Sequence, residues 1–204
     1  MTHLNIVPPP RGLTTMQPFF RELSVNRETA LALLDGLSPA QLGWRASPHR
    51  WSLAENCAHL ATITTIYLPA LDAAIRRGHA DAAYSDRPFQ GNVVSRLLVW
   101  SMEPPVRVRL KTPRALAPAA AQHPGEARVA YRTAQSAFEL RLERAAGLDL
   151  AHVRVTPPTL PRLRLALGTV LAMLLAHERR HLWQCTEVRQ AADFPLPIVA
   201  TGEQ

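Results

Sequence analysis

Residues 164–192 read RLALGTVLAMLLAHERRHLWQCTEVRQAA, and this stretch decides the fold. Its positions 167, 170, 174, 177, 181, 184 and 188 are spaced alternately by three and four residues. That spacing is typical of one face of a helix that packs in a bundle. We therefore predict a helix over residues 164–192 whose core-facing side carries two histidines, His177 and His181.

Three more segments are predicted to be helices by the same periodicity. Residues 17–37 repeat core-type positions at 19, 23, 26, 30, 33 and 37, and Gly36 is a suitable C-terminal stop. The helix expected over residues 52–77 begins with Ser52-Leu53-Ala54-Glu55, a capping box in which Ser and Glu bond each other's backbone amides. Another helix is expected over residues 126–146. Strand-like pieces are too short for a sheet, so the sequence predicts an all-α protein.

The connection between the second and third helices is long and rich in proline. Residues 79–125 contain proline at positions 88, 104, 105, 113, 118 and 124. Because proline interrupts helices, we expect one short helix over residues 92–102 and an extended piece over residues 106–112. A connection of this length lets the chain cross the bundle instead of turning straight back. We therefore predict a four-helix bundle with a long Pro-rich crossover between helices 2 and 3.

The composition indicates one domain. With 204 residues, 47% of them hydrophobic, the chain can build its own core without disulfides. We expect a flexible N-terminal segment over residues 1–16, the bundle domain over residues 17–192 and a C-terminal tail over residues 193–204. Cys57 and Cys185 are expected to be reduced residues that pack in the core.

The charge pattern argues against a nucleic-acid-binding protein. The net charge of +7 comes from 23 Lys and Arg against 16 Asp and Glu, but the arginines are scattered rather than gathered in a basic arm. The N-terminus has no apolar signal core, and the longest apolar run, residues 165–176, is shorter than the roughly 18 residues that a membrane span needs. We expect a cytoplasmic protein, without a membrane segment, that binds a small-molecule substrate.

The histidines are the most informative candidates for a functional site. Side chains four residues apart, such as His177 and His181, lie about 40° apart around a helix and about 6 Å apart along it, so both can reach one ion. On the predicted helix 52–77, His59 shares a face with positions 52, 56, 63, 66 and 70 and is the best third ligand. We predict a metal site of these three histidines. The alternative is that they only pack and hydrogen-bond in the core.

The stretch His177-Glu178-Arg179-Arg180-His181 also matches the H-E-x-x-H pattern of zinc peptidases. No histidine follows it, and Glu187 lies about 240° around the helix from His181, so the third ligand of that class is missing. A peptidase is therefore not expected. Glu178 is kept as a candidate catalytic residue, either as a base or as a partner that orients the site.

Three stretches together resemble the DinB-like (YfiT-type) superfamily of metal-dependent enzymes. They are LSPAQLGWRASPHRWSLAENCAHL (37–60), RLLVWSMEPPVRVRLKTPRALAPA (96–119) and AHERRHLWQ (176–184). The resemblance implies a four-helix bundle of unusual helix order. It also implies a divalent ion, usually zinc or nickel, held here by His59, His177 and His181.

The resemblance further implies a choice of chemistry. Members of that superfamily transfer a low-molecular-weight thiol such as bacillithiol, mycothiol or glutathione, isomerise thiol adducts, or act as hydrolases. We therefore consider a metal-dependent thiol transferase, a metal-dependent hydrolase and a non-enzymatic helical bundle. A thiol cosubstrate is expected only in the first case. A homodimer is compatible with a small bundle that has a long apolar crossing segment, although nothing in the sequence specifies one.

Overall fold

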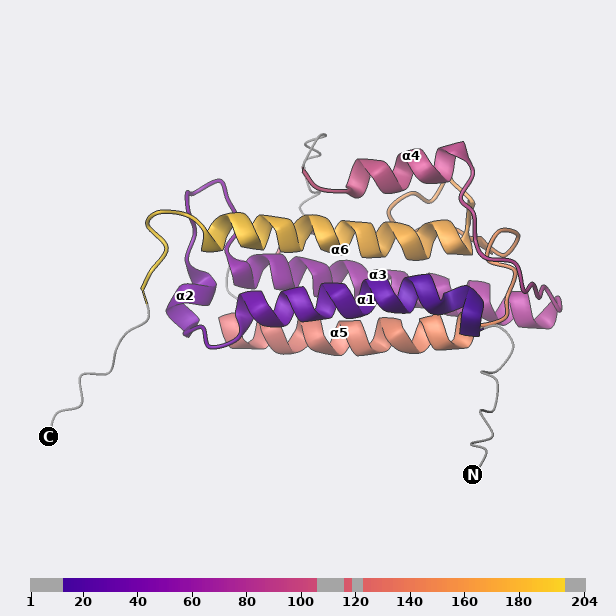
Figure 1. The fold of residues 1–204 in the computed structure, drawn as a ribbon, viewed down its shortest axis with the longest axis horizontal. Helices are drawn as coiled ribbons and strands as arrows, with labels where there is room; N and C mark the ends of the chain where they lie inside the picture. The colour runs from indigo at the N-terminus through magenta and orange to yellow at the C-terminus, as the bar shows by residue number, and fades with distance from the viewer. Residues whose placement is uncertain (1–12, 106–115, 119–122, 197–204) are drawn as a thin grey trace, which may run out of the picture.

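The computed structural model describes residues 13–105, 116–118 and 123–196. Four long helices lie side by side in it: α1 (Leu13–Leu34), α3 (Leu53–Ala80), α5 (Pro124–Ala145) and α6 (Leu167–Arg189) (Figure 1). The predicted all-α fold is confirmed. The extended piece expected over residues 106–112 and most of the two terminal segments lie outside the described residues.

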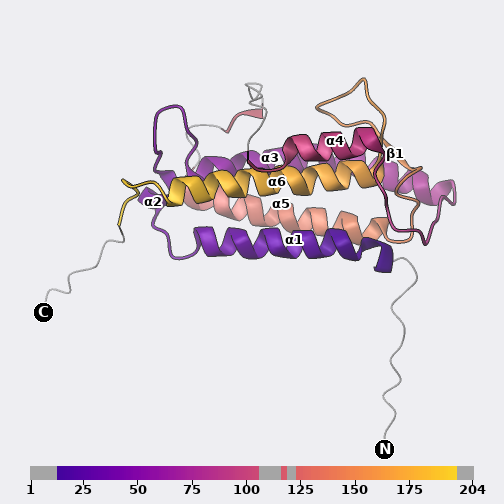
Figure 2. The same ribbon diagram turned by 45° about the horizontal axis from the view of Figure 1, so that its top comes forward.

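Two short helices accompany the bundle. Helix α4 (Val93–Met102) packs along α6 on the outside of the bundle, as Figure 2 also shows. It matches the short helix expected in the crossover, and Asn92 caps its N-terminus. Helix α2 (Pro39–Gly43) lies between α1 and α3, and Ser38 and Gln41 make a capping box at its start. The crossover therefore runs over α6 before the chain returns to α5.

The ends of the long helices differ by a few residues from the prediction. Helix α1 begins at Leu13 and ends at Leu34, and Gly36 takes the positive φ of 72° that stops a helix. Helix α6 begins three residues later than expected. The cause is β2 (Leu165–Ala166), which pairs antiparallel with β1 (Arg154–Val155) and holds the chain extended before the helix starts.

The capping box at the start of α3 is formed as predicted. Ser52 Oγ accepts from the Glu55 amide at 3.1 Å, and Glu55 Oε2 accepts from the Ser52 amide at 2.9 Å. Replacing Ser52 by alanine should lower the free energy of unfolding by about 1 kcal/mol, since the partly buried Glu55 amide loses its acceptor. Urea denaturation followed by circular dichroism measures the change.

The matched control for Ser52 is Ser136→Ala, at an exposed position inside α5. That substitution should change stability by less than about 0.5 kcal/mol. Equal effects of the two substitutions would contradict a stabilising capping box.

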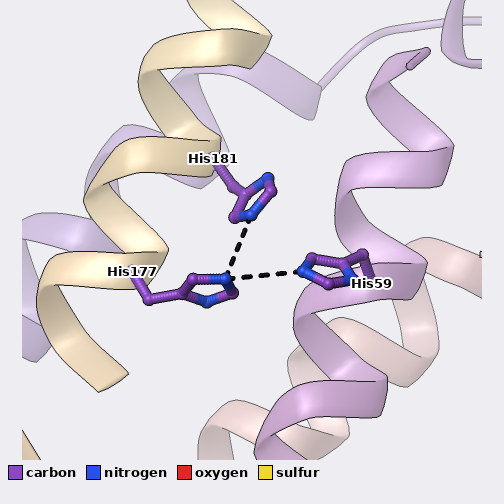
Figure 3. A group of neighbouring side chains, drawn as sticks. All are labelled: His59, His177 and His181. Carbon is purple, nitrogen blue, oxygen red and sulfur yellow. Dashed lines mark hydrogen bonds between the residues drawn. The ribbon is translucent and has the colours of Figure 1, made fainter. Parts of the chain in front are cut away.

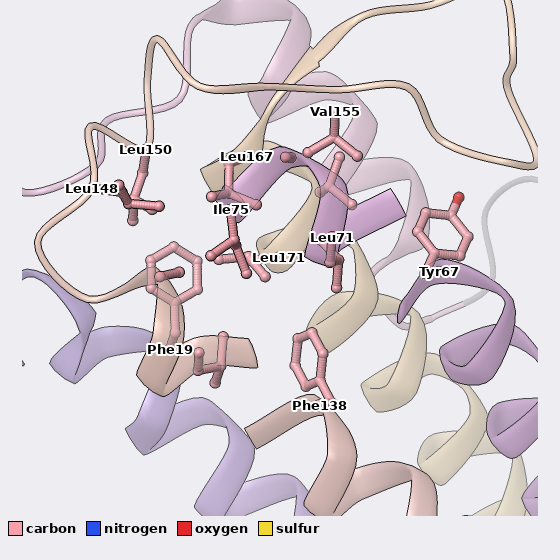
Figure 4. Packing of buried hydrophobic residues seen from close by; sticks show 14 of the residues in the cluster. Phe19, Tyr67, Leu71, Ile75, Phe138, Leu148, Leu150, Val155, Leu167 and Leu171 are labelled. Atoms are coloured by element: carbon pink, nitrogen blue, oxygen red, sulfur yellow. The ribbon is translucent and has the colours of Figure 1, made fainter. Parts of the chain in front are cut away.

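The core consists of two clusters stacked along the bundle axis. The first contains Phe19, Leu71, Phe138 and Leu171 among others (Figure 4). The second contains both cysteines, and burial raises the pKa of Cys57 to about 12, so the two thiols are packing residues as expected. Residues 176–181 of α6, with the two histidines, fall between the clusters.

Helix α6 is buried on more of its circumference than the sequence pattern indicated. Leu174, His177 and Gln184, predicted to face the core, are only half-buried. The other four positions of that face are buried, and so is a second stripe, because α6 contacts α1 on one side and both α3 and α4 on the others. This second stripe consists of Leu171, Leu175, Glu178, Leu182 and Cys185.

Within the described residues, one helix is long and apolar enough to cross a membrane by composition. This helix is α3, and half of its most apolar stretch is buried inside the bundle. A core helix of a soluble protein has the same property, so the finding does not indicate a membrane protein.

Candidate metal centre

Three imidazoles meet between α3 and α6, as the sequence predicted (Figure 3). His59 comes from α3, and His177 and His181 come from successive turns of α6. The Nε2 atom of His177 lies 3.4 Å from Nε2 of His59 and 3.2 Å from Nε2 of His181. The three candidate ligand atoms all lie within 4.8 Å of one another.

Hydrogen bonds at the opposite ring nitrogens orient two of the imidazoles. Nδ1 of His59 donates to the Leu116 carbonyl oxygen at 2.8 Å. Nδ1 of His181 lies 2.8 Å from Asn56 Oδ1. Since the amide nitrogen of Asn56 donates to the Ser52 carbonyl at 2.9 Å, its oxygen must accept from His181. In the neutral state both Nε2 atoms therefore carry a lone pair directed toward the centre.

This arrangement fits a metal ion better than a network of hydrogen bonds. Two lone pairs face Nε2 of His177, which in the neutral state can donate at most one proton. A tetrahedral ion with metal–nitrogen bonds near 2.05 Å places its ligand nitrogens about 3.3 Å apart, close to both separations found here. One cation would satisfy all three nitrogens at once.

Burial keeps these imidazoles in the state that binds metals. It lowers the pKa of His177 to about 3, with smaller contributions from the charges of His59 and Arg180. Burial also lowers the pKa of His59, and it holds the pKa of His181 well below its usual value. All three rings are therefore neutral at pH 7, as metal ligation requires.

Trp51 forms a wall of the centre. Its ring is stacked on His181 at 5.8 Å between centroids and tilted against His59 at 4.9 Å. From the sequence, Trp51 was expected only to cover an end of the bundle, and Asn56 only to share the face of His59. Asn56 could have been noticed, because it lies on the same face of the predicted helix as His59, whereas Trp51 precedes the helix and carries no periodic signal.

A cavity of about 850 Å³ opens onto the centre. Its lining comes from α3, α6, the end of α4 and the loops around residues 47–51 and 159–160. The three histidines share this lining with Arg50, Arg180 and Trp183. The site therefore has room for a small molecule beside the histidines.

Glu178 faces away from this cavity. Its carboxylate accepts from Asn26 Nδ2 at 2.9 Å, from Gln135 Nε2 at 2.6 Å and from the Tyr131 hydroxyl. Burial raises its pKa to about 7, although the bonds from Tyr131 and Asn26 oppose the shift. The prediction of a base or orienting residue stays untested, but these partners belong to α1 and α5 rather than to the histidine centre.

The remaining histidines lie apart from the centre. His49 is exposed at the mouth of the cavity, and His123 and His152 are exposed elsewhere. His79, also exposed, bonds the Arg144 carbonyl at 2.9 Å. His3 lies outside the described residues. The structure thus brings together the three histidines that the helix faces predicted.

A family model described as the DinB superfamily matches residues 22–185 of the chain. The matched range includes all three histidines of the centre together with Trp51 and Asn56. No curated protein and no solved structure gives a significant match to the chain.

Proposed function

This chain belongs to the DinB superfamily, and we propose that it is a metal-dependent enzyme in which His59, His177 and His181 hold a divalent ion. The observation that carries the proposal is the convergence of their Nε2 atoms at separations of 3.2 and 3.4 Å. Three neutral nitrogen ligands, with two separations that match those around a tetrahedral ion, favour zinc, and nickel is the alternative. Three protein ligands leave a coordination position for a reactant.

The proposed reaction is the transfer of a small thiol to an electrophile. A bound divalent ion supplies a Lewis acid that lowers the pKa of a thiol or water beside it. A thiol, with an ordinary pKa near 8.5, needs far less help than water, near 15.7. Glu178, the acidic residue next to His177 in the sequence, already accepts hydrogen bonds from Asn26, Tyr131 and Gln135. It is therefore not available as a base that would activate water.

The step itself is a nucleophilic substitution. The thiol loses its proton to solvent, and a sulfur electron pair forms a bond to the electrophilic carbon. The bond from that carbon to the leaving group breaks, and the leaving group departs with the bonding pair. Trp51 covers one side of the centre and limits the access of water from there. A thiol of the bacillithiol, mycothiol or glutathione type fits this scheme, as does a cytoplasmic location.

The test is turnover of 1-chloro-2,4-dinitrobenzene by the zinc-loaded and nickel-loaded protein with each of the three thiols. Complete ionisation of a thiol of pKa 8.5 at pH 7 should accelerate the reaction about 30-fold over the free thiol. His177→Ala should abolish the acceleration, and His123→Ala, at an exposed position, should keep it.

Two outcomes would overturn thiol transfer. Hydrolysis of ester or amide substrates by the metal-loaded protein without any thiol would indicate a hydrolase. Full metal content with no acceleration by any thiol and no hydrolysis would favour a bundle without enzymatic activity.

A further inference from the structure

The histidine centre divides the cavity into two unlike halves. Helices α3 and α6 run antiparallel, since Asn56 contacts His181 and, one turn further along α3, His59 contacts His177 (Figures 1 and 3). Residues after His59 on α3 therefore face residues before His177 on α6. Residues before α3 face the C-terminal half of α6.

One half of the cavity is apolar. Ile63 and Tyr67 follow His59 by one and two turns of α3, and Met173 precedes His177 by one turn of α6. Leu160 closes this half from the loop before β2. The Tyr67 hydroxyl is hydrogen-bonded to Thr159, so each of these polar groups already has a partner. A ligand group in this half meets mainly hydrocarbon and ring surface.

The other half is basic. Arg50 lies exposed on the loop before α3, and Arg180 lines the cavity with its guanidinium anchored on the Ser101 carbonyl at 3.1 Å. Among the described residues that line the cavity, Glu187 alone carries a carboxylate. Two guanidiniums and one carboxylate leave this half with an excess of positive charge.

The centre adds to that excess. Three neutral imidazoles do not reduce the charge of a divalent ion. Arg180 directly precedes His181 on α6 and lines the same cavity as the three histidines, so its positive charge lies close to the centre. The carboxylate of Glu178 is directed at Asn26 and Gln135 instead. An anionic ligand group is therefore favoured electrostatically on this side.

We propose that the cavity takes an amphipathic ligand whose carboxylate lies at Arg50 and Arg180 and whose apolar group lies among Ile63, Leu160 and Met173. The reacting sulfur lies between the two, beside the histidines. This inference rests on the proposed function and narrows it: the thiol cosubstrate supplies the carboxylate, which favours a thiol of the glutathione or bacillithiol type over mycothiol, and the electrophile supplies the apolar group.

The probe is 3-(benzylthio)propanoate, a thioether with a carboxylate on one side of sulfur and a phenyl ring on the other. Two matched probes each lack one end: its methyl ester has no charge, and 3-(methylthio)propanoate has no ring. Calorimetric titration of the zinc-loaded protein should give about tenfold weaker binding for each truncated probe.

Substitutions assign each end of the probe to its half of the cavity. Arg50→Gln and Arg180→Gln should each reduce the preference for the acid over the ester, and Leu160→Ser should reduce the preference for benzyl over methyl. Arg50 and Leu160 lie on loops, so the test does not depend on the buried Arg180 variant folding. Arg132→Gln, an exposed arginine on α5, is the matched control and should keep both preferences.

Elemental analysis separates the two possible failures. If the wild-type protein holds no ion, the proposed function fails, and the same three titrations on the metal-free protein decide the inference alone. Equal binding of acid and ester, binding of none of the probes, or an acid preference that survives in both arginine variants would overturn the inference.

Discussion

Replacing His177 by alanine is expected to reduce the bound divalent ion from about one per chain to less than about one in five chains. His177 contributes the nitrogen that lies close to both of the others, at 3.4 and 3.2 Å. Removing a residue that only hydrogen-bonds a metal ligand weakens metal affinity by about 10- to 100-fold. Removing the ligand itself should weaken metal affinity further. Elemental analysis and calorimetric zinc titration of tag-free protein measure the effect.

Two comparisons make this result specific. His123→Ala removes an exposed histidine that makes no capping hydrogen bond, and it should keep the full ion content. The half-buried, mid-helical position of His177 tolerates alanine, so circular dichroism should show an unchanged fold. If wild-type protein binds no ion, or if His177→Ala binds as much as wild type, the metal centre does not exist.

Replacing Glu178 by alanine is expected to cost about 3 to 5 kcal/mol of stability. The Glu178 carboxylate accepts from Asn26, Tyr131 and Gln135, all of which are buried. Without it, donors from α1 and α5 lose their acceptor between the two hydrophobic clusters, and a cavity remains. Urea denaturation of the metal-free protein measures the cost.

The control for this substitution is Glu143→Ala, which removes an exposed carboxylate from α5 and should change stability by less than about 0.5 kcal/mol. Tyr131→Phe combined with Glu178→Ala should cost less than the sum of the two single substitutions, since one donor then needs no acceptor. A cost below about 1 kcal/mol for Glu178→Ala, with lost turnover at full metal content, would instead support the predicted catalytic role of Glu178.

The sequence by itself determined those features that depend on local spacing. The capping box at Ser52 and the stop at Gly36 are set by a few neighbouring residues, so both could be predicted from the sequence. The i, i+4 spacing of His177 and His181 places them on one face of any helix that contains them. The apolar periodicity around His59 likewise predicted its inward position.

Only the tertiary structure decided what surrounds these histidines. The Leu116 carbonyl that orients His59 lies 57 positions away in the chain, and the Trp51 ring that covers His181 precedes the helix. In the sequence, Arg180 was only one of the two unspecified positions of the H-E-x-x-H pattern. In the structure it lines the cavity. These contacts depend on how α3 and α6 pack against each other, and the spacing of neighbouring residues in the sequence does not predict that packing.

Glu178 shows the physical reason most clearly. Its sequence position, next to His177, predicted a role at the metal, but adjacent residues of a helix point about 100° apart. Helix α6 is enclosed by α1 as well as by α3 and α4, so the same rotation carries the carboxylate into a separate buried network.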